Sequence, residues 1–323
     1  MKVTLDIIIV NWNSKGQLHD CLDSIVTASR DGFELSRVVV VDNASSDSSA
    51  EGLEYIDLPL TVIRNAENRG FAAACNQGAV ESKADYLLFL NPDTRLFFNS
   101  LSEPLAFMEQ LKNAYIGICG LKLIDDTGNM TTSCARFPTL GIFFGKMTGL
   151  SRLFPKLFVE HLMSSTELIH SLEVDQVIGA FFLVRRYVYD ENEGFDERFF
   201  MYFEEVDFSL RAKLKGYSSY YLSHVCAYHR GGGSTEQVKA TRLFYSLRSR
   251  IQYAFKHYSY LEALLLMSLT LFFELFARII LSIKLHSLSN FKETYEGYKN
   301  LFIYLLKGGI CENIRQKKFF RGN

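Results

Sequence analysis

The chain has almost no net charge, because its 323 residues hold 35 Lys and Arg against 36 Asp and Glu, for a formal charge of −1. Proteins that bind nucleic acid through bulk electrostatics are basic, so no nucleic acid partner is expected. Hydrophobic residues make up 48% of the chain and charged residues 22%. It is therefore too apolar for a disordered protein and too charged for one that crosses a membrane many times.

The cysteines lack the close spacing of a disulfide framework or a zinc site. They are scattered over the chain as Cys21, Cys75, Cys119, Cys134, Cys226 and Cys311. Such spacing indicates reduced, mostly buried thiols in a cytosolic protein. A signal peptide is not expected either, because the short apolar stretch Leu5–Val10 leads into Asn11-Trp12-Asn13 without a small-residue cleavage site.

A glycine-rich nucleotide fingerprint is also missing after the first apolar run, where the sequence reads Asn11-Trp12-Asn13-Ser14-Lys15-Gly16. An NAD-dependent oxidoreductase would have GxGxxG at this point. A sugar nucleotidyltransferase would need a basic, glycine-rich loop there. Both classes are disfavoured.

Short apolar runs dominate the first third of the chain. They are Ile7–Val10, Val38–Val41, Leu60–Ile63 and Tyr86–Leu90. Continuous rather than alternating runs are typical of strands buried on both faces. Helices are predicted between them at 17–29, 48–55 and 71–82. The pattern predicts an α/β fold with a mostly parallel central sheet flanked by helices.

The middle of the chain is less regular. We expect a turn at 125–129 after the run 116–124, an aromatic-rich mobile loop with short helices at 137–172, strands at 174–186 and 217–228, and a helix in the second half of 195–216 that Gly216 stops.

The neutral total hides two different parts. Residues 1–238 hold 21 basic and 31 acidic residues (net −10), and residues 239–323 hold 14 and 5 (net +9). We therefore expect one α/β domain over 1–238 and a helical, basic, amphipathic region over 239–323.

The segment Tyr260–Leu285 is strongly apolar, but its longest uncharged run, Ala263–Phe273, has 11 residues. A transmembrane helix needs roughly 20. On a helical wheel the charged residues of this segment share one arc of about 160°, which leaves a broad apolar face. These residues are Glu262, Glu274, Arg278 and Lys284. Glu274 and Arg278 form a favourable i,i+4 pair.

Two interpretations of this helix compete. It packs onto the rest of the protein, or it lies in a membrane interface. The surrounding positive charge favours an anionic leaflet; it includes Arg315, Lys317, Lys318 and Arg321. The sequence thus predicts a cytoplasmic protein, peripheral at the inner face of the cell membrane, with an anionic membrane surface as a partner.

Polar residues follow two predicted strands. Asp42 stands at the carboxyl edge of a parallel sheet, where ligands bind, and suits a nucleobase or ribose, with Asp47 supporting the turn. Alternatively, both acids cap the following helix. Asn68-Arg69-Gly70 opens a helix of small residues, and Gly70 would let the backbone approach a phosphate or base. The alternative is tight helix–sheet packing.

A third strand end carries Asn91-Pro92-Asp93. Asp93 would offer an oxygen ligand to a divalent cation that bridges a diphosphate, or would simply form a turn. His229 precedes a glycine run. A lone His is usually structural, but a neighbouring Asp raises the case for a metal ligand.

Three acids, Glu204, Glu205 and Asp207, crowd the first turn of a predicted helix. Acids there interact favourably with the helix dipole, so capping is one explanation. Because Phe and Tyr flank them, desolvation and like charge would raise the pKa of one carboxyl group, which suits a general base. Arg211 lies one turn beyond Asp207 and could fix its orientation.

Taken together, the motifs resemble a known family. In order, they are Ile9–Asn13, Val41–Asp47, Asn68–Phe71, Asn91–Asp93, Gly179–Phe182 and Phe199–Asp207. Over roughly residues 3–235 the chain is similar to inverting family 2 glycosyltransferases of the GT-A fold, within the rhamnosyltransferase-like branch.

The resemblance implies roles for the candidate residues. Asp42 would hold the nucleotide base or ribose, and Asp93 would bind Mg2+ or Mn2+ as the last acid of the family's Asp-x-Asp motif, whose first acid is replaced here by Asn91. His229 matches a metal-binding His of some relatives, and the base would be Glu204 or, slightly favoured, Glu205. The nucleotide-sugar set implied by the resemblance is Asn11, Asp42, Asn68, Arg69, Gly70, Asn91, Asp93, Asp207 and Arg211.

The implied reaction is a single in-line displacement that inverts the anomeric carbon, and the division at residue 238 separates a catalytic domain from a membrane-associating region. The favoured donor is dTDP-rhamnose, with UDP-hexose, UDP-N-acetylhexosamine and UDP-galactofuranose as alternatives. The acceptor would be lipid-linked or a polysaccharide in O-antigen- or capsule-like cell-surface glycan synthesis. A catalytically inactive, membrane-docked subunit of an assembly complex is the non-enzymatic alternative, and an oligomer is possible.

Overall fold

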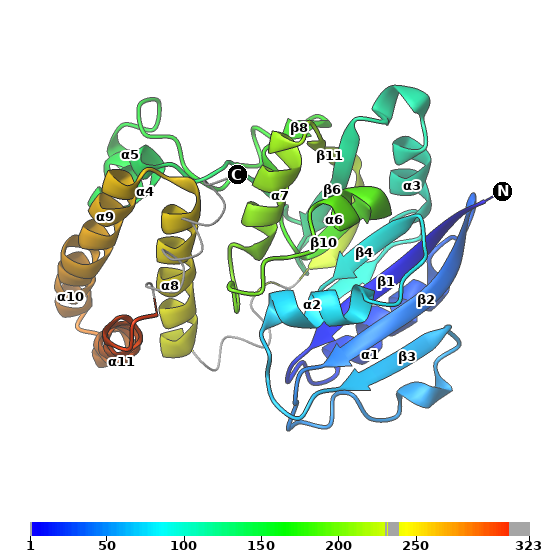
Figure 1. The fold of residues 1–323 in the computed structure, drawn as a ribbon, viewed down its shortest axis with the longest axis horizontal. Coiled ribbons are helices and arrows are strands. Elements are labelled where there is room, and N and C mark those ends of the chain that lie inside the picture. The colour runs from blue at the N-terminus through cyan, green and yellow to red at the C-terminus, as the bar shows by residue number, and fades with distance from the viewer. Residues whose placement is uncertain (1, 230, 232–238, 310–323) are drawn as a thin grey trace. The chain divides into compact units, whose positions relative to one another are not determined.

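Figure 1 shows the computed structural model, which describes residues 2–229, 231 and 239–309. The chain divides into two compact units. The first comprises Met1–Phe137, Leu162–Glu197 and Glu204–Ser234, and the second comprises Pro138–His161, Arg198–Phe203 and Thr235–Asn323. The predicted division at residue 238 therefore differs from the structure in two segments, 138–161 and 198–203, which group with the C-terminal helices. Cys311 and the predicted cations at 315, 317, 318 and 321 lie outside the described residues.

The first unit is built on a nine-stranded sheet in the order β3-β2-β1-β4-β10-β6-β11-β5, with β8 paired to β11. Its strands are β1 Val3–Asn11, β2 Phe33–Asp42, β3 Leu60–Arg64, β4 Tyr86–Leu90, β5 Thr94–Leu96, β6 Ile116–Ile124, β8 Leu172–Val174, β10 Phe181–Arg185 and β11 Ser218–His229. Strands β1 to β4 are mutually parallel, as predicted, and β10 runs antiparallel to β4 and β6. Strands β7 Cys134–Ala135 and β9 Gln176–Val177 form a separate pair.

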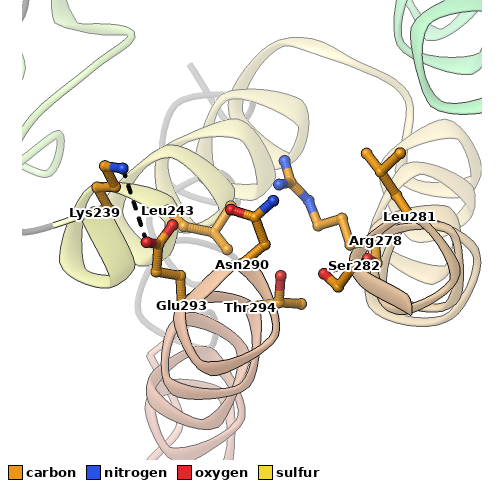
Figure 2. A pocket seen from close by; sticks show the side chains of 8 residues that line it. All are labelled: Lys239, Leu243, Arg278, Leu281, Ser282, Asn290, Glu293 and Thr294. Carbon is orange, nitrogen blue, oxygen red and sulfur yellow. Dashed lines mark hydrogen bonds and ion pairs between the residues drawn. The ribbon is translucent and has the colours of Figure 1, made fainter. Parts of the chain in front are cut away.

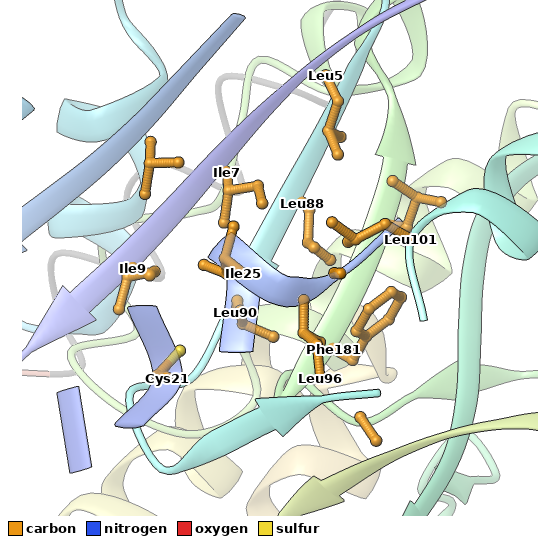
Figure 3. Close-up of a cluster of buried hydrophobic side chains, with 14 of the residues drawn as sticks. Leu5, Ile7, Ile9, Cys21, Ile25, Leu88, Leu90, Leu96, Leu101 and Phe181 are labelled. Carbon is orange, nitrogen blue, oxygen red and sulfur yellow. The ribbon is translucent and has the colours of Figure 1, made fainter. Parts of the chain in front are cut away.

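Helices cover both faces of this sheet. They are α1 Gln17–Thr27, α2 Phe71–Ala79, α3 Ser102–Met108, α6 Arg186–Glu191 and α7 Glu204–Leu214, together with the 3-10 turns η1 Leu53–Tyr55 and η2 Leu111–Asn113. In β1, Ile7 and Ile9 join the cluster that α1 and α3 cover (Figure 3), and Ile8 joins the cluster under α2 and α7. Successive strand residues point to opposite faces, so a continuous apolar run supplies two cores at once.

The predictions of a turn, a strand and a helix in the first unit have different outcomes. The turn at 125–129 is confirmed by a hydrogen bond from the Asp125 amide to the Asn129 carbonyl at 2.9 Å. The strand predicted at 174–186 is interrupted, because β9 and β10 are separate. The helix predicted at 48–55 is wrong. Ser48 has φ +58°, and the Asp47 side chain accepts from the Ser49 amide at 3.0 Å, so the segment forms a turn instead.

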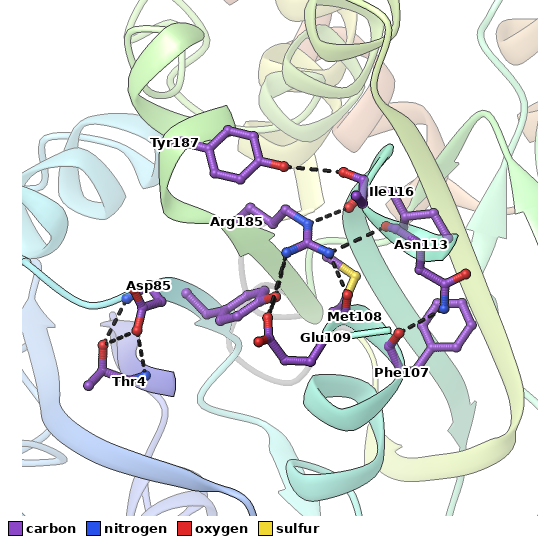
Figure 4. A network of polar contacts seen from close by, with 11 residues as sticks. Thr4, Asp85, Phe107, Met108, Glu109, Asn113, Ile116, Arg185 and Tyr187 are labelled. Atoms are coloured by element: carbon purple, nitrogen blue, oxygen red, sulfur yellow. Dashed lines mark hydrogen bonds and ion pairs between the residues drawn. The ribbon is translucent and has the colours of Figure 1, made fainter. Parts of the chain in front are cut away.

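Arg185, a buried arginine at the end of β10, joins this strand to its neighbours through hydrogen bonds (Figure 4). Arg185 donates through Nε to the Ile116 carbonyl at 2.8 Å and through Nη1 to the Tyr86 hydroxyl at 2.6 Å. Its Nη2 donates to the carbonyls of Met108 and Asn113. Each nitrogen of the buried guanidinium group thus has a partner, as a charge in a protein interior requires.

The second unit is helical. It contains α4 Leu140–Thr148, α5 Leu150–Leu153, α8 Lys239–His257, α9 Tyr260–Ser268, the π-helical turn η4 Leu269–Glu274, α10 Leu275–Lys284 and α11 Leu288–Leu306. Its core includes Leu247 and Ile251 of α8 together with Ala263 and Leu266 of α9. The short helices α4 and α5 confirm the prediction of helical pieces within 137–172.

Helices α9, η4 and α10 run on without a break over Tyr260–Lys284, which is 25 residues long with a mean hydropathy of 2.1. By length and composition alone it is the one helix among the described residues that is able to cross a membrane. The predicted i,i+4 pair is confirmed, with Arg278 Nη2 at 2.8 Å from Glu274, and Arg250 of α8 also pairs with Glu274.

Candidate active site

The ends of β1 and β2 bring two predicted residues together. Asn11 and Asp42 are register partners at the carboxyl edge of the sheet, and Asn11 Nδ2 donates to Asp42 Oδ1 at 2.9 Å. Both side chains are buried. Since no helix begins where Asp42 was expected to cap one, the capping alternative is wrong for this residue. Asn11 thus holds the Asp42 carboxylate at the carboxyl edge of the sheet, and its contact with a nucleotide stays a prediction.

Asn43, which the sequence reasoning missed, organises the next loop. Its Nδ2 donates to Asn68 Oδ1 at 2.9 Å, and its Oδ1 accepts from the Arg69 amide at 3.0 Å. Asn43 is buried, whereas the Arg69 side chain is exposed. Its position beside Asp42 in the same motif was the available signal.

Gly70 links this loop to α2. It has φ +88°, a left-handed conformation that favours glycine, and its amide bonds to Asn68 Oδ1 at 2.9 Å. The alternative of tight packing also holds, because a Cβ on Gly78 of α2 would lie 2.6 Å from Ile8 of β1. Tight packing and a loop conformation that favours glycine therefore coexist in this segment, and contact with a nucleotide stays a prediction.

The turn after β4 places Asp93 beside His229. The Asn91 amide donates to the Ala180 carbonyl and the Thr94 amide to the Asn91 carbonyl, each at 3.1 Å. Thr94 pairs with His229 in the β5–β11 ladder, and His229 Nε2 lies 3.4 Å from Asp93 Oδ1. The two side chains are only 13% and 11% exposed.

This pair fits a divalent cation in its chemistry. A carboxylate is a ligand that both Mg2+ and Mn2+ accept, an imidazole suits Mn2+ better than the harder Mg2+, and a diphosphate would supply further oxygens. Among the described residues there is no group of three or more His, Cys, Asp or Glu that could hold a metal. A small cavity of about 170 Å³ adjoins the pair. It is lined by Gln17, Asp20, Asp93, Arg95, Asp126 and Tyr228.

Glu204 and Glu205 open α7 as an acidic pair, in which Glu204 is buried and Glu205 is half-buried. One carboxylate oxygen of each has no hydrogen-bond partner. Burial, and after it the charge of Glu205, raises the pKa of Glu204 well above its usual value, and burial raises the pKa of Glu205. Burial and then the same two carboxylates raise the pKa of Cys75, which places the pair close to α2. The desolvation and like charge expected of a general base are therefore present.

The backbone immediately before this pair is strained. Tyr202 and Phe203 have φ of +68° and +71°, a region that non-glycine residues rarely adopt. Such consecutive outliers occur where the surrounding structure enforces them, often at functional sites.

Asp207 and Arg211 form an ion pair within α7. Arg211 Nε lies 2.8 Å from Asp207 Oδ2, and Arg211 also donates to the carbonyls of Asn192 and Gly194. Asp207 is fully buried. The expected orienting role of Arg211 fits these contacts, and a direct contact of either residue with a nucleotide sugar stays a prediction.

The chain is similar in sequence to known glycosyltransferases. The family model described as Glycosyl transferase family 2 matches residues 6–191, more than half of the chain. An uncharacterized glycosyltransferase of Haemophilus influenzae is 35% identical over 109 residues, which are 34% of this chain and 36% of that protein.

Two relatives carry more specific names. Rhamnosyltransferase WbbL of Escherichia coli is 29% identical over 171 residues, 52% of this chain and 61% of that protein. N-acetylglucosaminyl-diphospho-decaprenol L-rhamnosyltransferase of Mycobacterium tuberculosis is 24% identical over 259 residues, covering 75% and 81%. The chain thus spans less than two thirds of the H. influenzae and E. coli proteins.

Solved structures confirm the predicted GT-A fold. GalNAc-T7 with UDP, GalNAc and Mn2+ has a TM-score of 0.57 at 14% identity. The aligned region covers 77% of this chain and 48% of the GalNAc-T7 chain. The mannosyltransferase PcManGT of Pyrobaculum calidifontis, in complex with GDP-Man and Mn2+, has a TM-score of 0.54 at 14% identity and covers 100% and 89%.

Proposed function

This chain belongs to glycosyl transferase family 2, and on that premise we propose that it transfers L-rhamnose from dTDP-rhamnose, with inversion, to a sugar carried on a polyprenyl diphosphate. The names of the E. coli and M. tuberculosis relatives support rhamnose as the transferred sugar, and the latter name supports the acceptor. The product would enter a cell-surface glycan. The observation that carries the proposal is the acidic pair Glu204 and Glu205, each of which has one buried carboxylate oxygen without a hydrogen-bond partner.

In the proposed mechanism, a carboxylate of this pair takes the proton of the acceptor hydroxyl as that oxygen attacks the anomeric carbon. The bond from this carbon to the diphosphate oxygen breaks, and its electron pair leaves with dTDP. A raised pKa makes the carboxylate a stronger proton acceptor near neutral pH, which suits a general base. One displacement inverts the anomeric configuration, and no covalent intermediate with the enzyme forms.

The remaining residues bind and orient the donor. Asp42, held by Asn11, would accept from the base or ribose, and the Asn68–Gly70 loop, held by Asn43, would approach the nucleotide with its backbone. Asp93 and His229 would hold Mg2+ or Mn2+, which when bound neutralises charge on the departing diphosphate.

We place the enzyme in the cytoplasm, peripheral at the membrane, because a polyprenyl-linked acceptor is confined to a bilayer. The basic second unit supports this placement. Its described residues hold 14 Lys and Arg against 5 Glu, for a net charge of +9.

The test is turnover of the purified full chain with polyprenyl diphosphate N-acetylglucosamine, Mn2+ or Mg2+, and a panel of dTDP-rhamnose, UDP-hexose, UDP-N-acetylhexosamine and UDP-galactofuranose. We expect nucleotide release and product only with dTDP-rhamnose. Glu204→Gln or Glu205→Gln should lower kcat by a factor of about 10² to 10⁴. Glu54→Gln, at an exposed position, is the matched control. Wild-type turnover in both variants would exclude the pair as the base.

A further inference from the structure

The outer face of the helix Tyr260–Lys284 is apolar and exposed. Only 22% of its most apolar 18-residue window is buried. Large exposed side chains recur along it at intervals of three, four and seven positions, which places them on one side of a helix. This apolar stripe consists of Leu261, Leu265, Phe272, Phe276, Ile280 and Ile283.

Helix α11 extends this surface. Its own exposed apolar side chains include Leu288, Phe291, Tyr295 and Leu306. A groove of about 450 Å³ runs between α10 and α11, lined among others by Leu275, Ile279, Phe291, Phe302 and Ile303. Soluble monomers rarely expose contiguous apolar surface of this extent unless a partner covers it.

The charged residues of the helix avoid the stripe. Glu262 forms a capping box with Ser259 at the start of α9. Glu274 is buried and paired with both Arg250 and Arg278. Glu262 is exposed beside Leu261 at the start of the helix, and from Leu265 to Ile283 the stripe itself presents no charge.

Cations lie at one end of the groove. A second pocket, shown in Figure 2, contains Lys239 and Arg278 beside Asn290, and it shares Thr294 with the apolar groove. Lys239 is 3.9 Å from Glu293, a loose contact. An apolar groove that ends in cations, in a unit of net charge +9, is complementary to lipids with apolar chains and anionic headgroups.

We propose that the apolar stripe and the α10–α11 groove form a monotopic membrane-binding face, in which the helix Tyr260–Lys284 lies in the plane of an anionic bilayer and does not cross it. The stripe and groove contact acyl chains, and Lys239 and Arg278 lie at the level of the headgroups. We choose bilayer lipid over a protein as the occupant because the cations beside the apolar groove match the anionic headgroups of lipids. This choice also rests on the proposed lipid-linked acceptor.

The opposite side of the helix argues for the in-plane orientation. Ala263, Leu266 and Leu271 are core residues that pack with Leu247 and Ile251 of α8. A membrane-crossing helix would have to leave this core and separate Glu274 from Arg250, and removing one partner of a buried ion pair is strongly destabilising.

The experiment is flotation of the full chain with vesicles of phosphatidylcholine alone or mixed with phosphatidylglycerol. We expect binding to the mixed vesicles that is at least about tenfold tighter than to phosphatidylcholine and weaker at high salt. The double variant Phe272→Glu, Phe276→Glu should bind at least about tenfold more weakly, because two large apolar side chains are lost from the contact. Leu111→Glu, an exposed apolar position of the first unit, is the control.

Three outcomes would overturn the proposal: equal binding of the double variant and the wild type, failure of the wild type to float, or resistance of the bound protein to alkaline carbonate, which indicates a crossing helix. Light scattering of the free chain tests the remaining occupant, since a dimer that the double variant abolishes would assign the stripe to a second copy. Circular dichroism checks folding. Hydrolysis of dTDP-rhamnose without acceptor reports on catalysis separately, so failure of the membrane face and failure of the proposed activity are distinguishable.

Discussion

Replacing Glu204 with Gln should stabilise the first unit at neutral and alkaline pH while it removes activity. Burial and the neighbouring Glu205 raise the pKa of Glu204 in the fold. A carboxyl group with a raised pKa binds its proton more tightly in the folded chain than in the unfolded chain. The free energy of unfolding therefore falls as the pH rises from the unfolded pKa to the folded pKa, by up to about 1.4 kcal/mol for each pH unit and each such group.

The Gln variant removes one group from this pH dependence. Below the unfolded pKa both forms of the protein should be similarly stable, because Glu204 is then neutral in both states. Above the unfolded pKa, the free energy of unfolding of the variant should exceed that of the wild type by an amount that grows with each pH unit, until the pH passes the folded pKa. Glu205→Gln should show the same trend, since the two groups titrate as a coupled pair.

Urea unfolding at several pH values, followed through the fluorescence of the single tryptophan, Trp12, measures this difference. Trp12 lies just after β1 and so reports on the first unit. Glu54→Gln should follow the wild-type curve. Parallel pH profiles for the wild type and both variants at Glu204 and Glu205 would refute the argument that these carboxyl groups are held in a desolvated site.

Three further perturbations test other parts of the structure. Arg185→Met should lower the free energy of unfolding by about 1–3 kcal/mol, because buried carbonyls lose a charged donor. An unchanged free energy in urea unfolding would contradict this. Asn43→Ala should weaken dTDP binding about tenfold in calorimetry, since the Asn68–Gly70 loop loses its anchor, and unchanged affinity would count against the loop. His229→Ala should raise the Mn2+ concentration for half-maximal turnover at least about tenfold. EDTA should abolish the activity of the wild type reversibly. An equal Mn2+ requirement in the variant and the wild type would exclude His229 from the metal site.

The parallel half of the sheet was predictable from sequence because its strands are continuous apolar runs. Each residue of β1 from Leu5 to Val10 is buried, and this composition marks a two-sided strand without any knowledge of its neighbours. The antiparallel insertion of β10 between β4 and β6 was not predictable, since the direction of pairing depends on contacts far apart in the sequence. The helix at 48–55 failed because side-chain hydrogen bonds of Asp47 compete with helical ones.

The candidate site shows the same division. Residue types at strand ends indicated Asp42 and Asp93 as candidates, because nucleotides and cations bind such groups there, and the flanking aromatic residues indicated the acidic pair at the start of α7. Asn43 escaped notice since its importance lies in hydrogen bonds to a loop 25 residues further on, which composition does not reveal. The pairing of Asp93 with His229 likewise depends on the ladder between β5 and β11.

The left-handed residues before the acidic pair have a consequence for protein engineering. Each of Tyr202 and Phe203 holds a backbone conformation that costs a non-glycine residue roughly 1–2 kcal/mol. A search for heat-resistant variants that ranks positions by backbone strain would therefore place glycine at both. However, the Phe203 ring packs against Tyr253 at 5.4 Å between centroids, and the Tyr202 hydroxyl accepts from Arg242 at 3.1 Å. Glycine would delete both contacts in the two residues that directly precede Glu204, so relief of backbone strain at these positions would be offset by the loss of packing and of a hydrogen bond.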